Sequence, residues 1–268
     1  MKKKKYSWDA GDYNKHSSAQ YEWARELISK LNLNGAESIL DIGCGDGKVT
    51  ALIGSYLKKG NVTGIDSSAD MVKMAKKSFP PAKHPNLSFI VLDASGLNFD
   101  SLFDVAFSNA VLHWVKDQMS VLQGVQKCLK KSGRILFQMG GKGNAQDIMD
   151  TLDELIKNEK WWHYFDKFPF PYFFYSPDEY TQWLSEAGLI TKRLELIPKD
   201  MVQKGKEGLA GWARTTWMPY TQRVPDDQRN SFIEDIIDLY SEKFPIDDDD
   251  KGMFHVKKVR LEVEALKP

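Results

Sequence analysis

Residues 36–140 alternate between short apolar runs and stretches in which apolar residues recur at helical spacing. A short uninterrupted apolar run is typical of a buried parallel strand, and apolar positions three and four residues apart are typical of a helix. Strands joined by helical crossovers predict a parallel sheet with helices on both faces. The predicted strands cover 38–42, 62–65, 87–92, 103–107 and 134–139, and the predicted helices cover 49–57, 69–79 and 119–129.

Residues beyond 140 follow a different pattern, with an aromatic-dense stretch at 161–175. Two further strands, 190–197 and 255–265, are predicted to be antiparallel neighbours at one edge of the sheet. The whole pattern predicts one α/β domain over 1–268, with a doubly wound, mostly parallel seven-stranded sheet and an antiparallel edge strand. The remaining helical patterns (148–158, 180–186, 208–217 and 227–244) predict a lid made of residues 145–185 and 200–250.

The sequence Asp41-Ile-Gly-Cys-Gly-Asp-Gly47 lies directly after the first predicted strand and before a predicted helix. Its alternate glycines allow a tight turn and a close approach of the backbone to a ligand. The helix N-terminus behind them offers unpaired N–H groups to an anionic group. A dinucleotide-binding loop would have a third glycine where this chain has Lys48. Asp41, two positions before the first glycine, is placed to reach an ammonium group.

Acidic residues end the next two predicted strands. Asp66 follows Gly47 by nineteen residues, and Asp93 ends the third strand. Carboxyl ends of parallel strands share one edge of the sheet, where open α/β sheets bind their ligands. Asp66 is placed to accept both hydroxyls of a ribose, and Asp93 to accept from an adenine amino group. The glycine loop and the two acids together predict an adenosine-containing ligand.

These motifs, with Ser-Asn-Ala-Val-Leu-His-Trp at 108–114, resemble class I S-adenosylmethionine-dependent methyltransferases over residues 36–140. A resemblance along nearly the whole chain is to the trans-aconitate and juvenile-hormone-acid methyltransferase group, which esterifies carboxylates of small acids. That resemblance depends on Trp8, Tyr13, Phe-Gln-Met-Gly-Gly at 137–141 and the segment 208–217. The trans-aconitate type has glutamine where this chain has His113.

The resemblance implies S-adenosyl-L-methionine as the cofactor, with residues 1–30 covering it and 36–140 forming its binding core. Asp41 and Gly43 are expected to hold the methionine amino group, with help from the backbone of Asn109. The residues implied in cofactor binding are Trp8, Tyr13, Asp41, Gly43, Cys44, Gly45, Gly47, Asp66, Ser67, Met71, Asp93, Ala94, Asn109 and Ala110. Those implied in acceptor binding are Tyr13, Gln20, His113, Trp114 and Trp212, with His113 also the candidate catalytic residue.

The leading hypothesis is O-methylation of the carboxylate of a small, partly apolar acid. A carboxylate is already ionised at pH 7, so it needs no general base. A small-molecule N-methyltransferase or a phenol O-methyltransferase is the alternative, and would use His113 as its base. A nucleotide-binding oxidoreductase is a second alternative, which Lys48 disfavours. A third is a module that binds the cofactor without turnover.

Composition restricts the partners. The chain has 37 basic and 37 acidic side chains, so its balance lacks the basic excess typical of nucleic-acid binders. No apolar run approaches the roughly eighteen residues that span a bilayer. The two cysteines, Cys44 and Cys128, are too few for a disulfide framework and favour a cytoplasmic location. No ligand spacing typical of a metal site is present. A small-molecule acceptor is therefore the expected partner.

Overall fold

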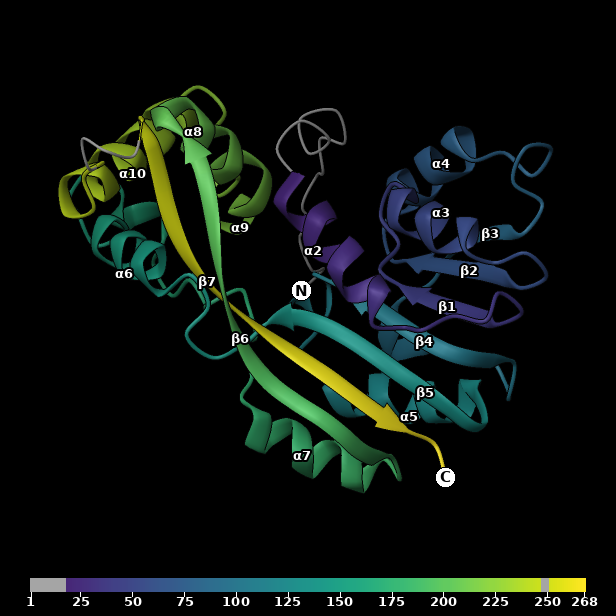
Figure 1. The fold of residues 1–268 in the computed structure, drawn as a ribbon. Coiled ribbons are helices and arrows are strands. Elements are labelled where there is room, and N and C mark those ends of the chain that lie inside the picture. Colours follow the sequence, from purple (N-terminus) through teal and green to yellow (C-terminus); the bar gives the residue numbers. More distant parts are fainter. Residues whose placement is uncertain (1–17, 247–250) are drawn as a thin grey trace. The chain divides into compact units, whose positions relative to one another are not determined.

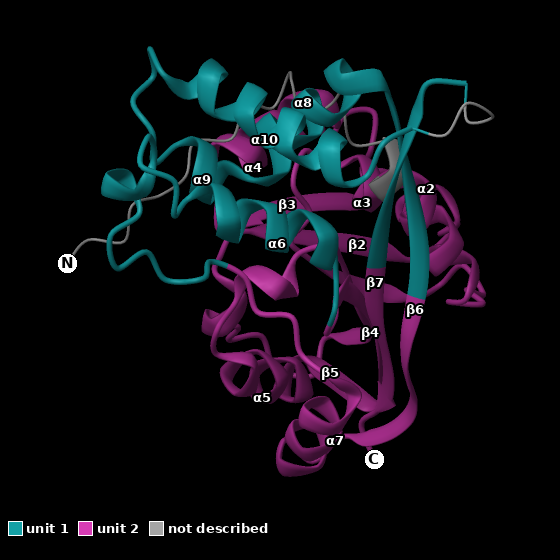
Figure 2. Cartoon of the chain, turned by 90° about the vertical axis from the view of Figure 1, so that its left-hand side faces the viewer, with its two compact units in different colours: residues 1–19, 143–171, 198–258 teal, residues 20–142, 172–197, 259–268 magenta. Residues whose placement is uncertain are grey.

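The computed structural model describes residues 18–246 and 251–268. The chain divides into two compact units (Figure 2). Unit 1 comprises residues 1–19, 143–171 and 198–258, and unit 2 comprises residues 20–142, 172–197 and 259–268. The chain therefore passes several times from one unit to the other, and each unit is described by itself below.

Unit 2 is built on a seven-stranded sheet in the order β3-β2-β1-β4-β5-β7-β6 (Figure 1). The neighbours among β1 to β5 are parallel, whereas β7 is antiparallel to β5. The chain winds outward from β1 in both directions, which confirms the predicted doubly wound sheet. The strands are β1 (Ser38–Ile42), β2 (Asn61–Asp66), β3 (Leu87–Val91), β4 (Phe103–Asn109), β5 (Leu129–Gly140), β6 (Ile190–Lys204) and β7 (Met253–Leu266).

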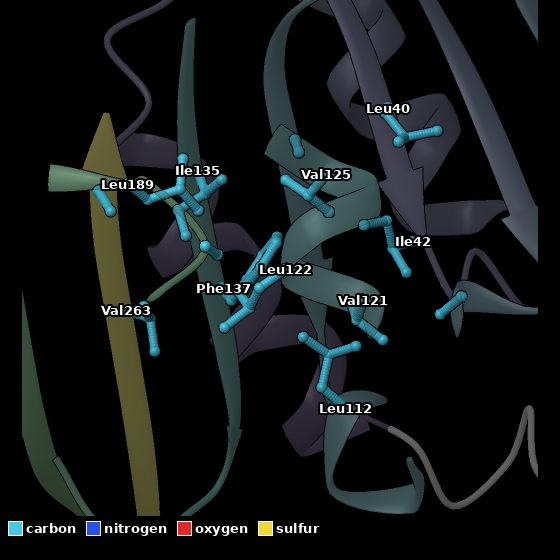
Figure 3. Close-up of a cluster of buried hydrophobic side chains, with 14 of the residues drawn as sticks. Leu40, Ile42, Leu112, Val121, Leu122, Val125, Ile135, Phe137, Leu189 and Val263 are labelled. Carbon is cyan, nitrogen blue, oxygen red and sulfur yellow. The ribbon is translucent and has the colours of Figure 1, made fainter. Parts of the chain in front are cut away.

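Helices cover both faces of this sheet. On one face, buried residues of α2 (Ser18–Ser29), α3 (Lys48–Ser55) and α4 (Ala69–Ser78) share a core with β1 to β5. On the other face, α5 (Gln118–Cys128) and α7 (Pro177–Glu186) pack on a second core, part of which is shown in Figure 3. A fully buried side chain such as Phe137 contributes about 1.5–3 kcal/mol to folding.

Two strands differ in length from their predictions. The predicted turn at 131–133 lies inside β5, where the pairing with β4 shifts register between Phe103 and Val105. The outermost strand, β6, continues past the predicted end at 197 through Pro198 to Lys204. An edge strand tolerates a proline because one of its sides needs no hydrogen-bonding partner.

Unit 1 contains helices and the outer parts of β6 and β7. Its helices are α6 (Gln146–Leu155), the 3₁₀ turn η3 (Trp162–Tyr164), α8 (Gly205–Thr216), α9 (Met218–Thr221) and α10 (Arg229–Lys243). Trp161 packs edge-to-face on Phe232 of α10, with ring centroids 5.0 Å apart. The expected lid reached residue 185, whereas α7 belongs to unit 2, because its Tyr180 and Leu184 are buried in the core of the sheet. That unit 1 covers the carboxyl edge of the sheet stays a prediction.

Candidate functional site

The glycine loop lies between β1 and α3, where the strand order reverses between β1 and β4. The Gly43 and Cys44 N–H groups donate to the Ile65 carbonyl at 2.7 and 2.9 Å, which ties the loop to the end of β2. Gly43 has a φ of 80°, and a Cβ at this position would lie 2.2 Å from Cγ2 of Val111. The loop therefore requires glycine both for its backbone angle and for its contact with the segment after β4.

Asp41 is the last polar residue of β1 and is 2% exposed. Its Oδ2 accepts a hydrogen bond from the Thr50 hydroxyl on α3 at 2.6 Å. Burial raises the pKa of Asp41 to about 7, the Thr50 hydrogen bond opposes this rise, and the nearby Asp66 charge adds to it. A buried carboxyl with this pKa is suited to an ammonium group, which would favour its ionised form.

Asp66 ends β2 and organises the loop beside it. Its Oδ2 accepts from Gly45 N–H at 3.1 Å and its Oδ1 from Ser68 N–H at 2.8 Å. Burial raises the pKa of Asp66, and the two backbone hydrogen bonds oppose that rise. The carboxylate is therefore held in a fixed orientation next to the glycine loop, as a ribose acceptor should be.

The other residues expected around the nucleoside follow β2 and β3. Ser67 is exposed, whereas Met71 is buried on α4 and donates its N–H to the Ser68 hydroxyl at 3.3 Å. Asp93 is exposed and caps the 3₁₀ turn η1 (Ala94–Gly96), because its Oδ1 accepts from Ser95 N–H at 2.9 Å. Asp93 thus has a structural role as a cap, and its contact with adenine stays a prediction.

The carboxyl end of β4 has an unusual backbone. Ala110 follows Asn109 with a φ of 60°, a left-handed conformation that costs a non-glycine residue about 1–3 kcal/mol. Its N–H donates to the Gln138 carbonyl at 2.8 Å, and Ser108 donates its hydroxyl to the Ile42 carbonyl at 2.9 Å. These bonds fasten the end of β4 to β5 on one side and to β1 on the other.

His113 lies in the 3₁₀ turn η2 (Leu112–Trp114), and its Nδ1 accepts a hydrogen bond from Gly140 N–H at 3.3 Å. Its ring is surrounded by aromatic side chains, with centroids 5.7 Å from Trp114, 6.4 Å from Tyr172 and 6.0 Å from Phe174. The Phe173 N–H also donates to the His113 carbonyl at 2.8 Å. The 172–174 segment therefore holds the imidazole at the end of β5.

The structure does not test the roles of four expected site residues. Trp8 and Tyr13 lie outside the described residues, and Gln20 lies on α2 without a described side chain. Trp212 lies on α8 in unit 1, where it is 1% exposed and packs edge-to-face on Trp217 with centroids 5.2 Å apart. Its Nε1 has no hydrogen-bond partner.

The structure also reveals polar residues that sequence reasoning missed. Gln138, Arg260 and Glu262 are all buried on β5 and β7. Glu262 accepts a hydrogen bond from Lys30, the residue after the end of α2, at 2.8 Å and forms an ion pair with Arg193 of β6 at 2.8 Å. The one available signal was that charged residues recur at alternate positions of β7 within an otherwise apolar strand.

The geometry of unit 2 fits S-adenosylmethionine. Asp41 could hold the methionine ammonium group, the open backbone of the glycine loop the chain next to it, and Asp66 the ribose. No cluster of three His, Cys, Asp or Glu in residues 18–246 and 251–268 could hold a metal ion. In the same ranges, no helix has both the length and the apolar character needed to cross a bilayer. Both cysteines are free, and burial raises the pKa of each thiol.

Comparison with known proteins identifies the family of this chain. Residues 40–137 match the methyltransferase domain family. An uncharacterized methyltransferase of Schizosaccharomyces pombe is 32% identical over 207 residues, which is 72% of this chain and 74% of the relative. A trans-aconitate 2-methyltransferase of Rhizobium rhizogenes is 24% identical over 263 residues, covering 95% of this chain and 98% of the relative.

A solved methyltransferase structure from Bacillus halodurans has the same fold, with a TM-score of 0.62, 19% identity, and coverage of 91% of this chain and 98% of that one. Other structures of this fold hold S-adenosylmethionine or S-adenosylhomocysteine. The chain belongs to the class I S-adenosylmethionine-dependent methyltransferases, near the trans-aconitate group.

Proposed function

We propose that this enzyme O-methylates the carboxylate of a small acid. The observation that supports this proposal best is the hydrogen bond from Gly140 N–H to Nδ1 of His113. A neutral imidazole that accepts at Nδ1 carries its proton on Nε2. Nε2 is then a donor, which suits an acceptor carboxylate, and it has no lone pair with which to remove a proton from an amine or phenol.

The reaction of a carboxylate requires little of the protein beyond alignment. Bound S-adenosylmethionine supplies a methyl group on a sulfonium sulfur, so that the C–O bond forms as the C–S bond breaks, giving a methyl ester and S-adenosylhomocysteine. The acid is already ionised at pH 7, and no proton has to move. His113 would orient the carboxylate through Nε2–H, and the aromatic rings around it would keep water from the reacting atoms.

The relatives support the same chemistry. The Rhizobium rhizogenes protein that aligns with nearly the whole chain is a trans-aconitate 2-methyltransferase, whose acceptor is a carboxylic acid. Where that type has glutamine, this chain has His113. The terminal NH₂ of a glutamine side chain is a hydrogen-bond donor at about the same distance from the backbone as Nε2 of histidine. A shared donor would explain how either residue serves one reaction.

Two substitutions of His113 test the proposal. His113→Gln retains a donor at the position of Nε2, whereas His113→Asn is too short to provide it. Loss of a charged hydrogen bond costs roughly 1.5–3 kcal/mol, which is about ten- to a hundredfold. With small acids such as trans-aconitate, itaconate and suberate, we expect His113→Gln to retain activity and His113→Asn to raise the acceptor KM by that factor. We also expect that kcat does not increase as pH rises through about 6.5, the increase that a histidine acting as general base would cause.

A base-assisted reaction would give the opposite pattern. In that case amines or phenols would be methylated and acids would not. His113→Gln would then lower kcat by a thousandfold or more with the acceptor KM unchanged. Either result would overturn the proposed carboxylate chemistry.

A further inference from the structure

One face of the sheet in unit 2 carries a row of polar side chains at its carboxyl edge. Residues paired across neighbouring strands point to the same face, and successive residues of a strand alternate between faces. Asp41 pairs with Phe107, two residues before Asn109, which itself pairs with Gln138. Asp41, Asn109 and Gln138 therefore share a face. This is the face on which α2 packs, because Phe107 lies in the core that α2 shares.

Arg260 extends this row on β7. Gln138 pairs with Glu262, and Gly140 with Arg260, so both β7 side chains lie on the same face as Gln138. Gly140 is also the residue whose N–H holds His113. Arg260 is thus the cross-strand neighbour of Gly140, the residue that positions His113.

The guanidinium of Arg260 is held in place from two sides. Its Nε donates to Oε1 of Gln138 at 3.4 Å, and its central carbon lies 5.4 Å from the ring centroid of Trp23 on α2. Gln138 is itself oriented, because its NH₂ donates to Oε1 of Glu262 at 3.0 Å. Arg260 is 4% exposed. Burial and fixed orientation are the properties expected of a group that binds a ligand in a defined direction.

Glu262 is already engaged with other cations. It is fully buried, with Lys30 at 2.8 Å and Arg193 at 2.8 Å. These two cations and Gln138 lower its pKa against the opposing effect of burial. The carboxylate therefore stays charged and stabilises the cluster. Arg260 adds a permanent positive charge and a planar set of donors, which matches the geometry of a carboxylate.

We propose that Arg260 determines acceptor specificity by binding a second carboxylate of the acceptor, distinct from the one that is methylated. This inference depends on the proposed carboxylate chemistry. The attacking carboxylate loses its charge in the transition state, so pairing it with a guanidinium would stabilise the ground state and slow the reaction. A carboxylate that keeps its charge throughout can bind Arg260 without this cost. The preferred acceptors would then be acids with at least two carboxylates.

The test compares dicarboxylates with their own monoamides, which differ only in one charge. Itaconate, adipate and suberate serve as probes, each beside its monoamide. We expect the wild type to prefer at least one diacid over its monoamide by a hundredfold or more in kcat/KM. Arg260→Met should remove this preference by lowering kcat/KM for the diacid, with less than a threefold change for the monoamide. Binding of the same pairs by calorimetry, in the presence of S-adenosylhomocysteine, should show the same difference in Kd.

Two further variants separate binding from folding. Arg260→Lys retains the charge but loses the planar donors, so it should weaken diacid binding about tenfold with little change in Tm; it also serves if Arg260→Met fails to fold. Arg193→Met is the matched control, because it removes a cation of the same cluster from β6. It should lower Tm without changing the ratio of diacid to monoamide.

Three outcomes would overturn the inference. Arg260→Met could lower activity and binding equally for diacid and monoamide, which would make Arg260 a structural residue only. The wild type could methylate monoamides as well as diacids. If the wild type methylates neither but accepts amines or phenols, the proposed function itself has failed, and this last result is distinguishable from the other two.

Discussion

The affinity for S-adenosylmethionine is expected to rise with pH through about 7, and Asp41 is the reason. Burial raises the pKa of this carboxyl to about 7. An ammonium group binds the ionised carboxylate, so binding of the methionine moiety would drive a proton from the fraction of Asp41 that is neutral. Ligand binding and proton release should therefore be linked.

The size of the linkage follows from the pKa. With a value of about 7, roughly half of Asp41 is protonated at pH 7, about nine-tenths at pH 6 and about one-tenth at pH 8. About 0.5 proton should be released per ligand at pH 7, and the dissociation constant should be about tenfold weaker at pH 6 than at pH 8.

Calorimetry with S-adenosylhomocysteine, in buffers of different ionisation enthalpy, measures both quantities. Asp41→Asn should lose most of the proton release. 5′-Methylthioadenosine is the matched control ligand, because it has the nucleoside and the sulfur but no amino group. Its binding should retain only the pH dependence that Asp66 contributes. A wild type that releases no proton at pH 7, or an Asp41→Asn variant with the same pH slope, would refute the assignment of Asp41.

The same pKa has an opposite consequence for the protein without ligand. The unfolded pKa is 3.8 and the folded pKa is about 7, so the folded state binds more protons between these values. The contribution of Asp41 to stability is then greatest below about pH 4 and declines as pH rises towards 7. Asp41→Asn removes this penalty and should raise the free energy of unfolding at pH 8, by at most about 4 kcal/mol. Chemical unfolding at pH 5 and pH 8 would measure the difference.

Three substitutions test other parts of the description. Gly43→Ala should lower stability by about 1–3 kcal/mol and abolish cofactor binding, since its Cβ meets Val111; adding Val111→Ala should restore only part of the stability because φ is still 80°. In thermal melts, Asp66→Ala should lose most of the stabilisation by S-adenosylmethionine, which for the wild type is about 2.7 kcal/mol at a hundredfold excess over Kd, while NAD should stabilise neither protein. Trp212→Phe should lower Tm, because the smaller ring leaves a cavity at this buried position, and should raise the acceptor KM if the indole Nε1 donates to the acceptor; an unchanged KM would remove Trp212 from the site.

The sheet was predictable because each of its central strands is a short apolar run that ends at a marker residue, either a glycine or a residue with a polar side chain. β1 lies at Ser38–Ile42 as predicted, and β2 ends at Asp66, as its carboxylate indicated. These markers are local in sequence, so a single chain displays them. The α7 helix begins at Pro177 instead of at 180, because Ser176 and Glu179 form a capping box that extends it by one turn.

The polar row could not be predicted, because it depends on register. From the sequence alone, Lys30 and Glu262 are ordinary surface charges 232 residues apart. Only the pairing of β5 with β7 turns Glu262 and Arg260 towards the buried face beside Gln138. In the same way, the tautomer of His113 depends on Gly140, a neighbour that periodicity does not reveal.

The late position of β7 in the chain has a consequence for biosynthesis. Residues 259–268 complete unit 2, and β7 lies between β5 and β6 in the sheet. During translation, β1 to β5 are synthesised well before β7, the strand that pairs with the outer edge of β5. The edge of β5 therefore stays unpaired while the segments of unit 1 are synthesised. Such contacts between distant parts of a chain form slowly and leave an unpaired strand edge exposed in the meantime. Nascent chains halted before residue 253 should therefore be prone to aggregate, and they should bind chaperones that recognise exposed strands.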